Sequence, residues 1–584
     1  MTGTLIEMLR STADRVGDEH GIRFYETREE SAFLGYAELD RSSRTMAAAL
    51  SQRGLVPGDV VVLALNSDLE FIRAAYGALY AGLAIAPAPV SETNAPDVMR
   101  ARIAEIAAAS GARLIISQEA VLDRFRPLPT AESFGSVAVT TVAELRNAGD
   151  AKAWTEPAID EGALATLMFT SGSTGDPKGV VSTHGTLLSS MEALTPSLNG
   201  TPDSVIVGWA PFHHAMGFAV AVILPAYLAA SAVLTTAVQF QRRPIFWLQL
   251  ISRHRGTMSA AANFAFALCT QFATDEQISE LDLSSLDVIV NGAEPVRTET
   301  MRAFLDRFSS AGIRESMMAP GFGATETMLV TMKQLGQKMV VLDFDATALE
   351  SGTLKPVTKS ERSVELVSCG VAGPGCIVAI ADPSTGERLA DGQVGEIWAA
   401  GPNIAHGYWR RPDATAEAFG AHLADDEHDY YRTGDLGALI NGEMFVTGRL
   451  KDLIIVRGRN IYPQDIEAAA ARFHPAVGMG TAFELTGHPA DVGIILEVDG
   501  NETPLDNAEL NTLALNLRSD LVHQFSLPSL AIGFLVAGEL PRTALGKVRR
   551  AFTRSALENG QLRLVYADGF SPRVQDAARS VAAG

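Results

Sequence analysis

The sequence predicts an α/β protein with a large N-terminal region of mostly parallel sheets layered with helices and a small mobile α+β C-terminal domain. The chain has 584 residues, of which 47% are hydrophobic, and this length exceeds what one ordinary core accommodates. Strand and helix patterns alternate through the first part, as they do in parallel sheets covered by helices. After about Gly448 the pattern changes, which predicts domains at 1–448 and 449–584.

Short apolar strands and helical spacing define the first elements in order. Helices are expected at 36–53, 69–81 and 95–109, and strands at 60–65, 83–87 and 114–117. Further apolar strands are expected at 205–210 and 286–291, each followed by a turn that contains Pro or Gly. Because ligand sites in such sheets gather at the carboxyl ends of strands, these turns are where we expect the site.

The C-terminal region predicts two strands, 492–498 and 531–536, flanking one helix at 507–524. Because no long low-complexity linker precedes it, the hinge between the two domains must be short.

Charge and cysteine content narrow the classes of function. A net charge of −21 argues against nucleic acid or an anionic membrane as a partner, because phosphate binding needs clustered Lys and Arg. Three cysteines are too few for a disulfide framework, and acidic residues interrupt the N-terminus where a signal peptide is apolar, so a cytoplasmic protein is expected. The uncharged stretch 215–234 is interpreted as a core helix interrupted by Pro225, without stable membrane insertion.

The segment 170–179 reads TSGSTGDPKG and predicts a phosphate-binding loop. Glycines let backbone N–H groups approach an anion, hydroxyl groups add donors, and Lys178 supplies positive charge. Gly179 and the β-branched residues after it break the Walker pattern, so strand, loop, strand is expected. The alternative is a solvated Gly/Ser surface turn. The predicted contacts are Thr170, Ser171, Gly172, Ser173, Thr174, Gly175 and Lys178.

This loop resembles the signature of the adenylate-forming superfamily of acyl-CoA synthetases, luciferases and peptide-synthetase adenylation domains. Further signatures follow in the family's order, from GYAELD at 35–40 to RTALGK at 542–547. The resemblance implies ATP and Mg²⁺ as cofactors. It places Asn291, Gly292, Ala293, Glu294, Gly321, Phe322 and Gly323 around adenine, Thr325 on the α-phosphate, and Glu326 on the metal. A carboxylate suits a hard divalent ion, although Glu326 taken alone could also be a carboxylate at a helix start.

Further motifs complete the implied nucleotide site. In YRTGDLG (431–437), Asp435 resembles the residue that accepts both ribose hydroxyl groups, and Arg449 is the second ribose and phosphate contact. Lys451 occupies the position of the family's hinge. Lys547 is the expected catalytic residue, because a placed ammonium stabilises the charge that builds when a carboxylate attacks the α-phosphate. Outside its motif, such a lysine would be an ordinary solvated surface group.

The acyl pocket is expected around PFHHAMGF (211–218), where Ala215 replaces the Asp found in many relatives. The implied substrate-binding residues are His214 as the gate, Met216, Gly217 and Asn263. A core histidine is the alternative, which applies above all to His213.

Three features resemble the fatty acyl-AMP ligases among these families. Two are strings, IIVRGRNIYPQDIE at 454–467 and QRRPIFWLQLISRHRGTMSAAANFAFALC at 241–269. The third is an insertion expected at about 334–367, which in that branch packs on the large domain and hinders rotation of the small one, so that CoA cannot attack. An ordinary long loop is the alternative.

The expected function is ATP-dependent activation of a fatty or other hydrophobic carboxylic acid to acyl-AMP, followed by transfer to the phosphopantetheine thiol of an acyl carrier protein. Carrier proteins of this kind are acidic, so docking needs a local basic patch. A fatty acyl-CoA synthetase and a non-catalytic acyl- or nucleotide-binding homologue are the alternatives. Nothing in the sequence singles out a luciferase-type oxidation.

Overall fold

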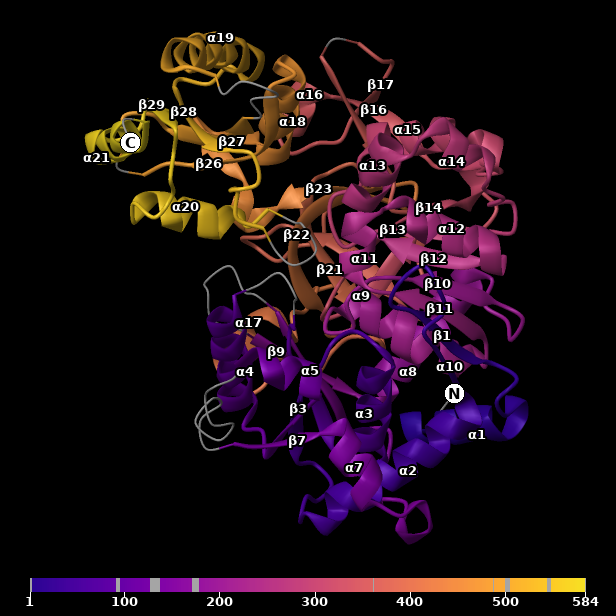
Figure 1. The fold of residues 1–584 in the computed structure, drawn as a ribbon. Coiled ribbons are helices and arrows are strands. Elements are labelled where there is room, and N and C mark those ends of the chain that lie inside the picture. The colour runs from indigo at the N-terminus through magenta and orange to yellow at the C-terminus, as the bar shows by residue number, and fades with distance from the viewer. Residues whose placement is uncertain are drawn as a thin grey trace.

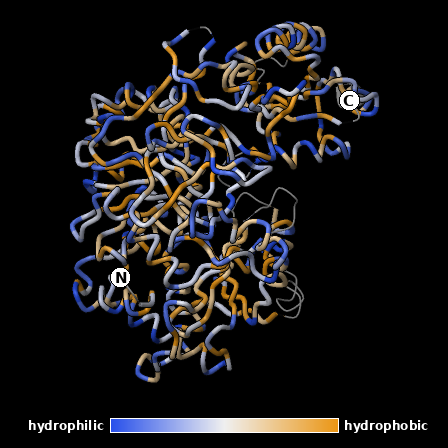
Figure 2. The backbone as a smooth tube through the Cα atoms, turned by 180° about the vertical axis from the view of Figure 1, so that it is seen from behind, coloured by the Kyte–Doolittle hydropathy of each residue, from blue (hydrophilic) through white to orange (hydrophobic). Residues whose placement is uncertain are grey.

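A computed structural model describes residues 3–90, 95–125, 137–170, 178–360, 362–486, 488–498, 505–542 and 548–582. Two large helix-covered sheets occupy the N-terminal part, and a smaller α+β unit, orange to yellow in Figure 1, lies against one end of it. Hydrophobic segments run through the sheets, whereas many peripheral segments are hydrophilic (Figure 2).

The first sheet has six strands, and five of the predicted patterns form it. Its order is β7 (Ala138–Thr141), β5 (Leu114–Ser117), β3 (Val60–Ala64), β4 (Ala84–Pro87), β8 (Leu164–Thr170) and β9 (Lys178–Thr183). All neighbours are parallel except β8 and β9, which form the predicted strand–loop–strand unit around the phosphate loop.

The second sheet has nine strands and carries most of the predicted site. Its order is β19 (Val371–Ala372), β15 (Met328–Met332), β14 (Met318–Ala324), β13 (Val288–Asn291), β12 (Met258–Ala261), β10 (Val205–Gly208), β11 (Ser231–Thr235), β1 (Gly21–Tyr25) and β2 (Ala32–Gly35). The run from β14 to β1 is parallel, so its carboxyl ends meet at one edge.

Helices fill three layers around these sheets. The helices between the sheets bury a common core, and they are α1 (Leu5–Val16), α2 (Tyr36–Gln52), α3 (Leu69–Tyr80) and α8 (His184–Leu198). The outer face of the nine-stranded sheet packs on α11 (Ala237–Arg242), α12 (Ile245–His254), α13 (Asn263–Phe272) and α15 (Thr298–Phe308). Helix α4 (Pro96–Ser110) covers the outer face of the six-stranded sheet. Because α3 is sandwiched, its residues are buried almost all round, and Asp68 caps its amino end.

Two smaller sheets adjoin the nine-stranded sheet. One contains β20 (Ile377–Ala381), β21 (Gly395–Ala400), β22 (Tyr431–Ile440) and β23 (Glu443–Arg449). The other falls inside the predicted insertion and contains β17 (Pro356–Val357), β16 (Val341–Asp345) and β18 (Ser363–Val367), with α16 (Ala346–Glu350) after β16. We call this segment the three-stranded unit.

The C-terminal unit is the small α+β arrangement that the sequence predicts. Its strands are β24 (Ile454–Val456), β25 (Arg459–Ile461), β26 (Val477–Glu484), β27 (Val492–Val498), β28 (Leu530–Val536) and β29 (Tyr566–Asp568). Its helices are α18 (Pro463–Phe473), α19 (Asn507–Phe525), α20 (Arg550–Glu558) and α21 (Pro572–Ala582). Helix α19 starts at an Asp506–Glu509 capping box and buries leucines at helical spacing.

The uncharged stretch 215–234 is a largely buried, uninterrupted helix up to Leu228, and only its last residues depart from the core helix expected from the sequence. It forms α9 (Ala215–Gly217), a π-helical segment Phe218–Ile223 and α10 (Leu224–Leu228), and then turns into strand β11. Pro225 lies inside this continuous helical run, just after the π-helical segment, and because proline has no N–H it removes a helical hydrogen bond there. Among the described residues, no helix is both long enough and apolar enough to cross a bilayer.

Candidate nucleotide and acyl site

The predicted site residues gather where the parallel strands of the nine-stranded sheet end. Strand β12 leads to Asn263, β13 ends at Asn291, and β14 leads into the Thr325–Glu326 turn. The register pairs Ala261 with Asn291 and Asn291 with Pro320, so these three ends are adjacent.

Asn263 and Asn291 form a polar network at this edge. Asn291 is fully buried and donates through Nδ2 to Asn263 Oδ1 at 3.2 Å. The same oxygen accepts from the backbone of Arg297 at 3.1 Å, and Asn263 Nδ2 donates to Thr300 at 3.2 Å. Asn263, expected in the acyl pocket, therefore also fixes the segment that follows the predicted adenine residues.

The Gly292–Glu294 segment is held by contacts on both sides. Gly292 donates its backbone N–H to Ala261 at 3.2 Å, and Ala293 adopts a left-handed φ of 65°. The Glu294 carboxylate accepts from the backbone of Phe264 at 2.5 Å, at the amino end of α13. A carboxylate there is favourable because helix starts carry unpaired N–H groups.

A tight hairpin between β14 and β15 presents Thr325 and Glu326. The Thr327 hydroxyl accepts from the backbone of Ala324 at 3.0 Å, and Asn403 donates to the Thr327 carbonyl at 2.8 Å. Thr325 and Glu326 are partly exposed, whereas Thr327 is buried, so the turn directs the two predicted site residues outward. Phe322, expected against adenine, packs in an apolar cluster with Cys369, Ile380, Ile397 and Met444.

Gly323→Ala should destabilise this hairpin and lower adenylate formation. A Cβ at this position would lie 1.8 Å from the Met328 carbonyl oxygen, a backbone atom that cannot move aside alone. We expect a loss of about 2–3 kcal/mol of local stability, measured by denaturant unfolding alongside pyrophosphate release. Gly208→Ala in β10 is the control, because its nearest atom would be 3.5 Å away. Wild-type behaviour of Gly323→Ala would contradict this packing.

Glu326 has a tyrosine partner that the motifs do not predict. The Tyr408 hydroxyl donates to Glu326 Oε1 at 2.9 Å, and Lys178 Nζ lies 4.7 Å from the centre of the Tyr408 ring. Burial and the Glu326 carboxylate raise the pKa of Tyr408, so the phenol stays protonated and donates. Tyr408 thus connects the predicted metal-binding carboxylate with the lysine at the end of the phosphate loop.

Asp435 and Arg449 face each other across β22 and β23. They are directly paired in the register, and Arg449 Nε donates to Asp435 Oδ1 at 2.9 Å. The Asp435 side chain is 11% exposed and that of Arg449 is 57% exposed. The carboxylates of Asp435, Asp452 and Glu326, in decreasing order, raise the pKa of Arg449. The predicted ribose contacts therefore lie in the same part of the molecule as Glu326, the predicted metal ligand.

The predicted acyl gate lies after β10. His214 caps the short helix α9, and its Nδ1 accepts from the backbone of Met216 at 3.3 Å. Gly217 is required by packing, because a Cβ there would lie 2.1 Å from the Pro211 carbonyl oxygen. Burial and His214 lower the pKa of His213 to about 3, so this imidazole is neutral near pH 7.

Some predicted residues lie at or beyond the limits of the described chain. Thr170 pairs with Lys178 at the two ends of the phosphate loop. Lys451 is exposed in the short 3₁₀ helix Leu450–Asp452 that follows β23. Ser171, Gly172, Ser173, Thr174, Gly175 and Lys547 lie outside the described residues, and their roles stay predictions.

The sequence motifs do not predict Tyr408 and Asn403, which contact Glu326 and Thr327 of the candidate site. Both belong to the segment between β21 and the helix α17 (Pro412–Ala418). Asn403 is 1% exposed. Because its amide contacts a loop far away in the chain, the residues around it in the sequence show no pattern that would reveal this contact. The GYW string at 407–409 is the one signal that points to Tyr408.

The ends of β12, β13 and β14 carry the Asn residues and the Thr–Glu turn, and the β22–β23 hairpin of another sheet carries the Asp–Arg pair. Polar side chains at the carboxyl ends of parallel strands are typical of a nucleotide-binding α/β enzyme. The chain belongs to the family of AMP-binding enzymes, whose model matches residues 10–409.

Similar proteins cover nearly the whole chain. The medium-chain fatty acid–acyl-carrier-protein ligase JamA of Moorena producens is 35% identical over 99% of this chain and 98% of its own length. A structure from a study of fatty acyl-adenylate ligases of E. coli and L. pneumophila matches with a TM-score of 0.86 and 29% identity, over 95% of this chain and 98% of that one. The L. pneumophila fatty acyl-adenylate ligase in complex with acyl adenylate and pyrophosphate matches at 0.74 and 30% identity, over 97% and 98%.

Proposed function

We propose that this enzyme uses ATP to convert a fatty or other hydrophobic carboxylic acid into acyl-AMP with release of pyrophosphate. The acyl group then passes to the phosphopantetheine thiol of an acyl carrier protein. The relatives named above support both steps, because one is a fatty acid–acyl-carrier-protein ligase and another was solved with acyl adenylate and pyrophosphate.

The chemistry assigns distinct tasks to the site residues. A carboxylate oxygen of the acid attacks the α-phosphorus, and the bond to the bridging oxygen of pyrophosphate breaks. Negative charge builds on the α-phosphate during this step, and Lys178, Thr325 and Lys547 stabilise it electrostatically. Asp435 accepts the ribose hydroxyl groups and so fixes the nucleotide for attack.

Mg²⁺ fits the residues that are present. Among the described residues, no group of three His, Cys, Asp or Glu side chains could hold an ion by itself. One carboxylate suits Mg²⁺, which keeps several waters and takes its other ligands from phosphates. Glu326 would hold the ion, which neutralises phosphate charge when bound, while Tyr408 orients the carboxylate through their 2.9 Å hydrogen bond.

The packing of the three-stranded unit on the large region favours a carrier-protein acceptor over CoA. Its Phe344 packs edge-on against Phe445 of β23, with ring centres 5.2 Å apart. Its Glu365 accepts from Arg302 of α15 at 2.6 and 2.8 Å. The segment is therefore packed and ion-paired on the large region, which a free surface loop would not be.

The same unit also holds the C-terminal unit. Arg459 of β25 makes a two-pronged contact with Glu350 of α16, at 2.9 and 2.7 Å. Arg459 also donates to the carbonyls of Phe525 and Ser526 at the end of α19. Figure 1 places α16 beside α18 of the C-terminal unit. This contact opposes the rotation that would open the site to CoA, and we call it the Glu350–Arg459 clamp.

Glu350→Gln should loosen the clamp and raise acyl-CoA formation about fivefold, since a well-aligned pair at the surface contributes ~1 kcal/mol. Acyl-AMP formation should be unchanged, because the Glu350 carboxylate pairs with Arg459 and not with a predicted nucleotide residue. Thioester formation from ATP, acid and CoA is the measurement. Glu558→Gln, which breaks the Arg554–Glu558 pair within α20, is the control. If CoA turnover does not rise, the clamp does not restrict the acceptor.

ATP–pyrophosphate exchange over a panel of carboxylic acids tests the proposed function, with CoA or a phosphopantetheinylated carrier protein added in parallel. We expect exchange with medium or long aliphatic acids and acyl transfer to the carrier. Efficient turnover of CoA by the wild type would instead identify an acyl-CoA synthetase. Absence of acid-dependent exchange would identify a non-catalytic binding protein.

A further inference from the structure

A second pocket, lined by three arginines, lies outside the site described above. Its volume is about 400 Å³, in the range of small-molecule sites. The lining residues come from the loop after β1, from α12 and its preceding turn, and from the segment after α14 (Asp275–Ser279), and they are Arg28, Arg243, Phe246, Gln249, Ser252, Arg253, Glu280 and Leu281.

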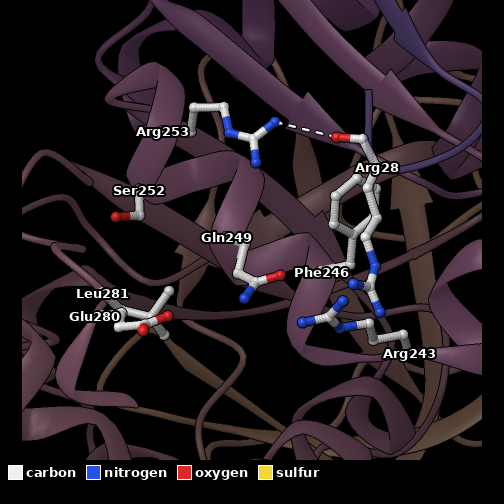
Figure 3. Close-up of a pocket in the computed structure, with 8 residues that line it drawn as sticks. All are labelled: Arg28, Arg243, Phe246, Gln249, Ser252, Arg253, Glu280 and Leu281. Atoms are coloured by element: carbon white, nitrogen blue, oxygen red, sulfur yellow. Dashed lines mark hydrogen bonds between the residues drawn. The ribbon is translucent and has the colours of Figure 1, made fainter. Parts of the chain in front are cut away.

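Two of the three arginines converge, and none of the three has an acidic partner among the described residues. Figure 3 shows the guanidinium groups of Arg28 and Arg243 pointing toward each other. Arg253 donates to the backbone carbonyl of Arg28 at 3.2 Å, which holds the third guanidinium near the same wall. Over the part of the chain that the structure describes, no carboxylate lies within 4.0 Å of a guanidinium nitrogen of Arg28, Arg243 or Arg253. The one acidic lining residue, Glu280, is exposed.

An anion bound between the guanidinium groups of Arg28 and Arg243 would offset the repulsion between them. Burial and the neighbouring Arg28 lower the pKa of Arg243, as expected for like charges held together. The chain as a whole carries a net charge of −21, so two facing guanidinium groups differ in sign from its average charge. Guanidinium groups bind phosphate through paired N–H donors, and two that face one opening can share one phosphate.

An apolar wall completes the pocket. Phe246 and Leu281 are 2% and 9% exposed and line it beside the arginines. The Gln249 amide and the Ser252 hydroxyl add uncharged hydrogen-bonding groups. A bare inorganic anion would use the guanidinium groups alone, whereas an organic phosphate would also cover the apolar wall. We propose that this pocket binds a small organic phosphate monoester, with the phosphate on Arg28 and Arg243 and an apolar part against Phe246.

The pocket is separate from the nucleotide site. Arg28 follows β1, and β1 lies four positions from β13 in the order β13, β12, β10, β11, β1. At ~4.8 Å per strand this places the two strand ends about 19 Å apart. The pocket shares no residue with the nucleotide and acyl residues named above, so its occupation does not depend on the proposed reaction.

Calorimetric titration with phenyl phosphate tests the assignment. The full-length protein is first saturated with a non-hydrolysable acyl-adenylate analogue, which removes binding at the nucleotide site. We expect one equivalent of phenyl phosphate to bind, at least threefold more tightly than inorganic phosphate. Arg28→Ala and Arg243→Ala should each weaken this binding at least tenfold and leave ATP–pyrophosphate exchange unchanged, which shows that both variants fold.

Arg255→Ala is the matched control, because Arg255 is an exposed neighbour paired with Asp282 at 3.8 Å and does not line the pocket. It should bind phenyl phosphate like the wild type. The assignment is overturned if phenyl phosphate does not bind the wild type, or if the Arg28 and Arg243 variants bind it undiminished. Equal affinity for phenyl phosphate and inorganic phosphate would also overturn it, because the apolar wall would then have no part.

Discussion

Lys547→Ala is expected to lower the rate of acyl-AMP formation by about 10²–10³-fold, the usual effect of removing one group that stabilises transition-state charge. The attacking carboxylate and the α-phosphate are both anionic, so the ammonium acts mainly on the barrier and less on binding of either substrate. Acid-dependent ATP–pyrophosphate exchange under saturating ATP and acid is the measurement. Because Lys547 lies outside the described residues, this expectation rests on its motif and on the charge balance.

Transfer of preformed acyl-AMP to the carrier protein should proceed nearly normally in Lys547→Ala, since pyrophosphate has already left. Lys547→Arg should retain part of the exchange activity because it keeps the positive charge. Lys152→Ala, at an exposed lysine in another part of the chain, is the control. Unchanged exchange in Lys547→Ala would remove this lysine from the chemistry.

Asp435→Ala is expected to raise the KM for ATP roughly 30- to 150-fold, the equivalent of about 2–3 kcal/mol from hydrogen bonds to a charged group. The carboxylate faces Arg449 at 2.9 Å, so its removal deprives both the ribose and the guanidinium of a partner. The KM for the acid should change little, because Asp435 lies in β22 and the predicted acyl gate follows β10. Initial rates at varied ATP and fixed acid measure the effect.

Asp425→Ala is the matched control for Asp435→Ala. Asp425 also pairs with an arginine, Arg388, at 2.8 Å, but on the surface. Its loss should leave both KM values unchanged. An equal effect of the two substitutions would mean that Asp435 acts through general stability and does not bind nucleotide.

The regular elements were largely predictable because their patterns are local. The expected strand 492–498 is β27 to the residue, and the expected helix 95–109 is α4 shifted by one position. The helix expected over 215–234 ends at Leu228, because an apolar run without polar positions has no period and does not show where a helix gives way to a strand. The division into domains at 448 and 449 stays a prediction.

Each sequence motif predicts the role of a residue within that motif, and these roles stay predictions. Asp435 and Arg449 belong to separate motifs, and the strand register places them face to face. Contacts between distant segments left no such signal. Tyr408 reaches Glu326 across 82 positions, and Glu350 reaches Arg459 across 109. Pairs of this kind depend on how sheets and units pack, which local spacing does not encode.

Under the proposed function, the Glu350–Arg459 clamp would let the choice of acid and the choice of acceptor evolve separately. The predicted acyl residues follow β10 and β12, whereas the clamp lies between α16 and β25 and includes none of them. A lineage could therefore exchange one acceptor for another through a few surface substitutions while it keeps its acid. Conversely, gene duplicates could diversify their acids and stay committed to the same biosynthetic partner.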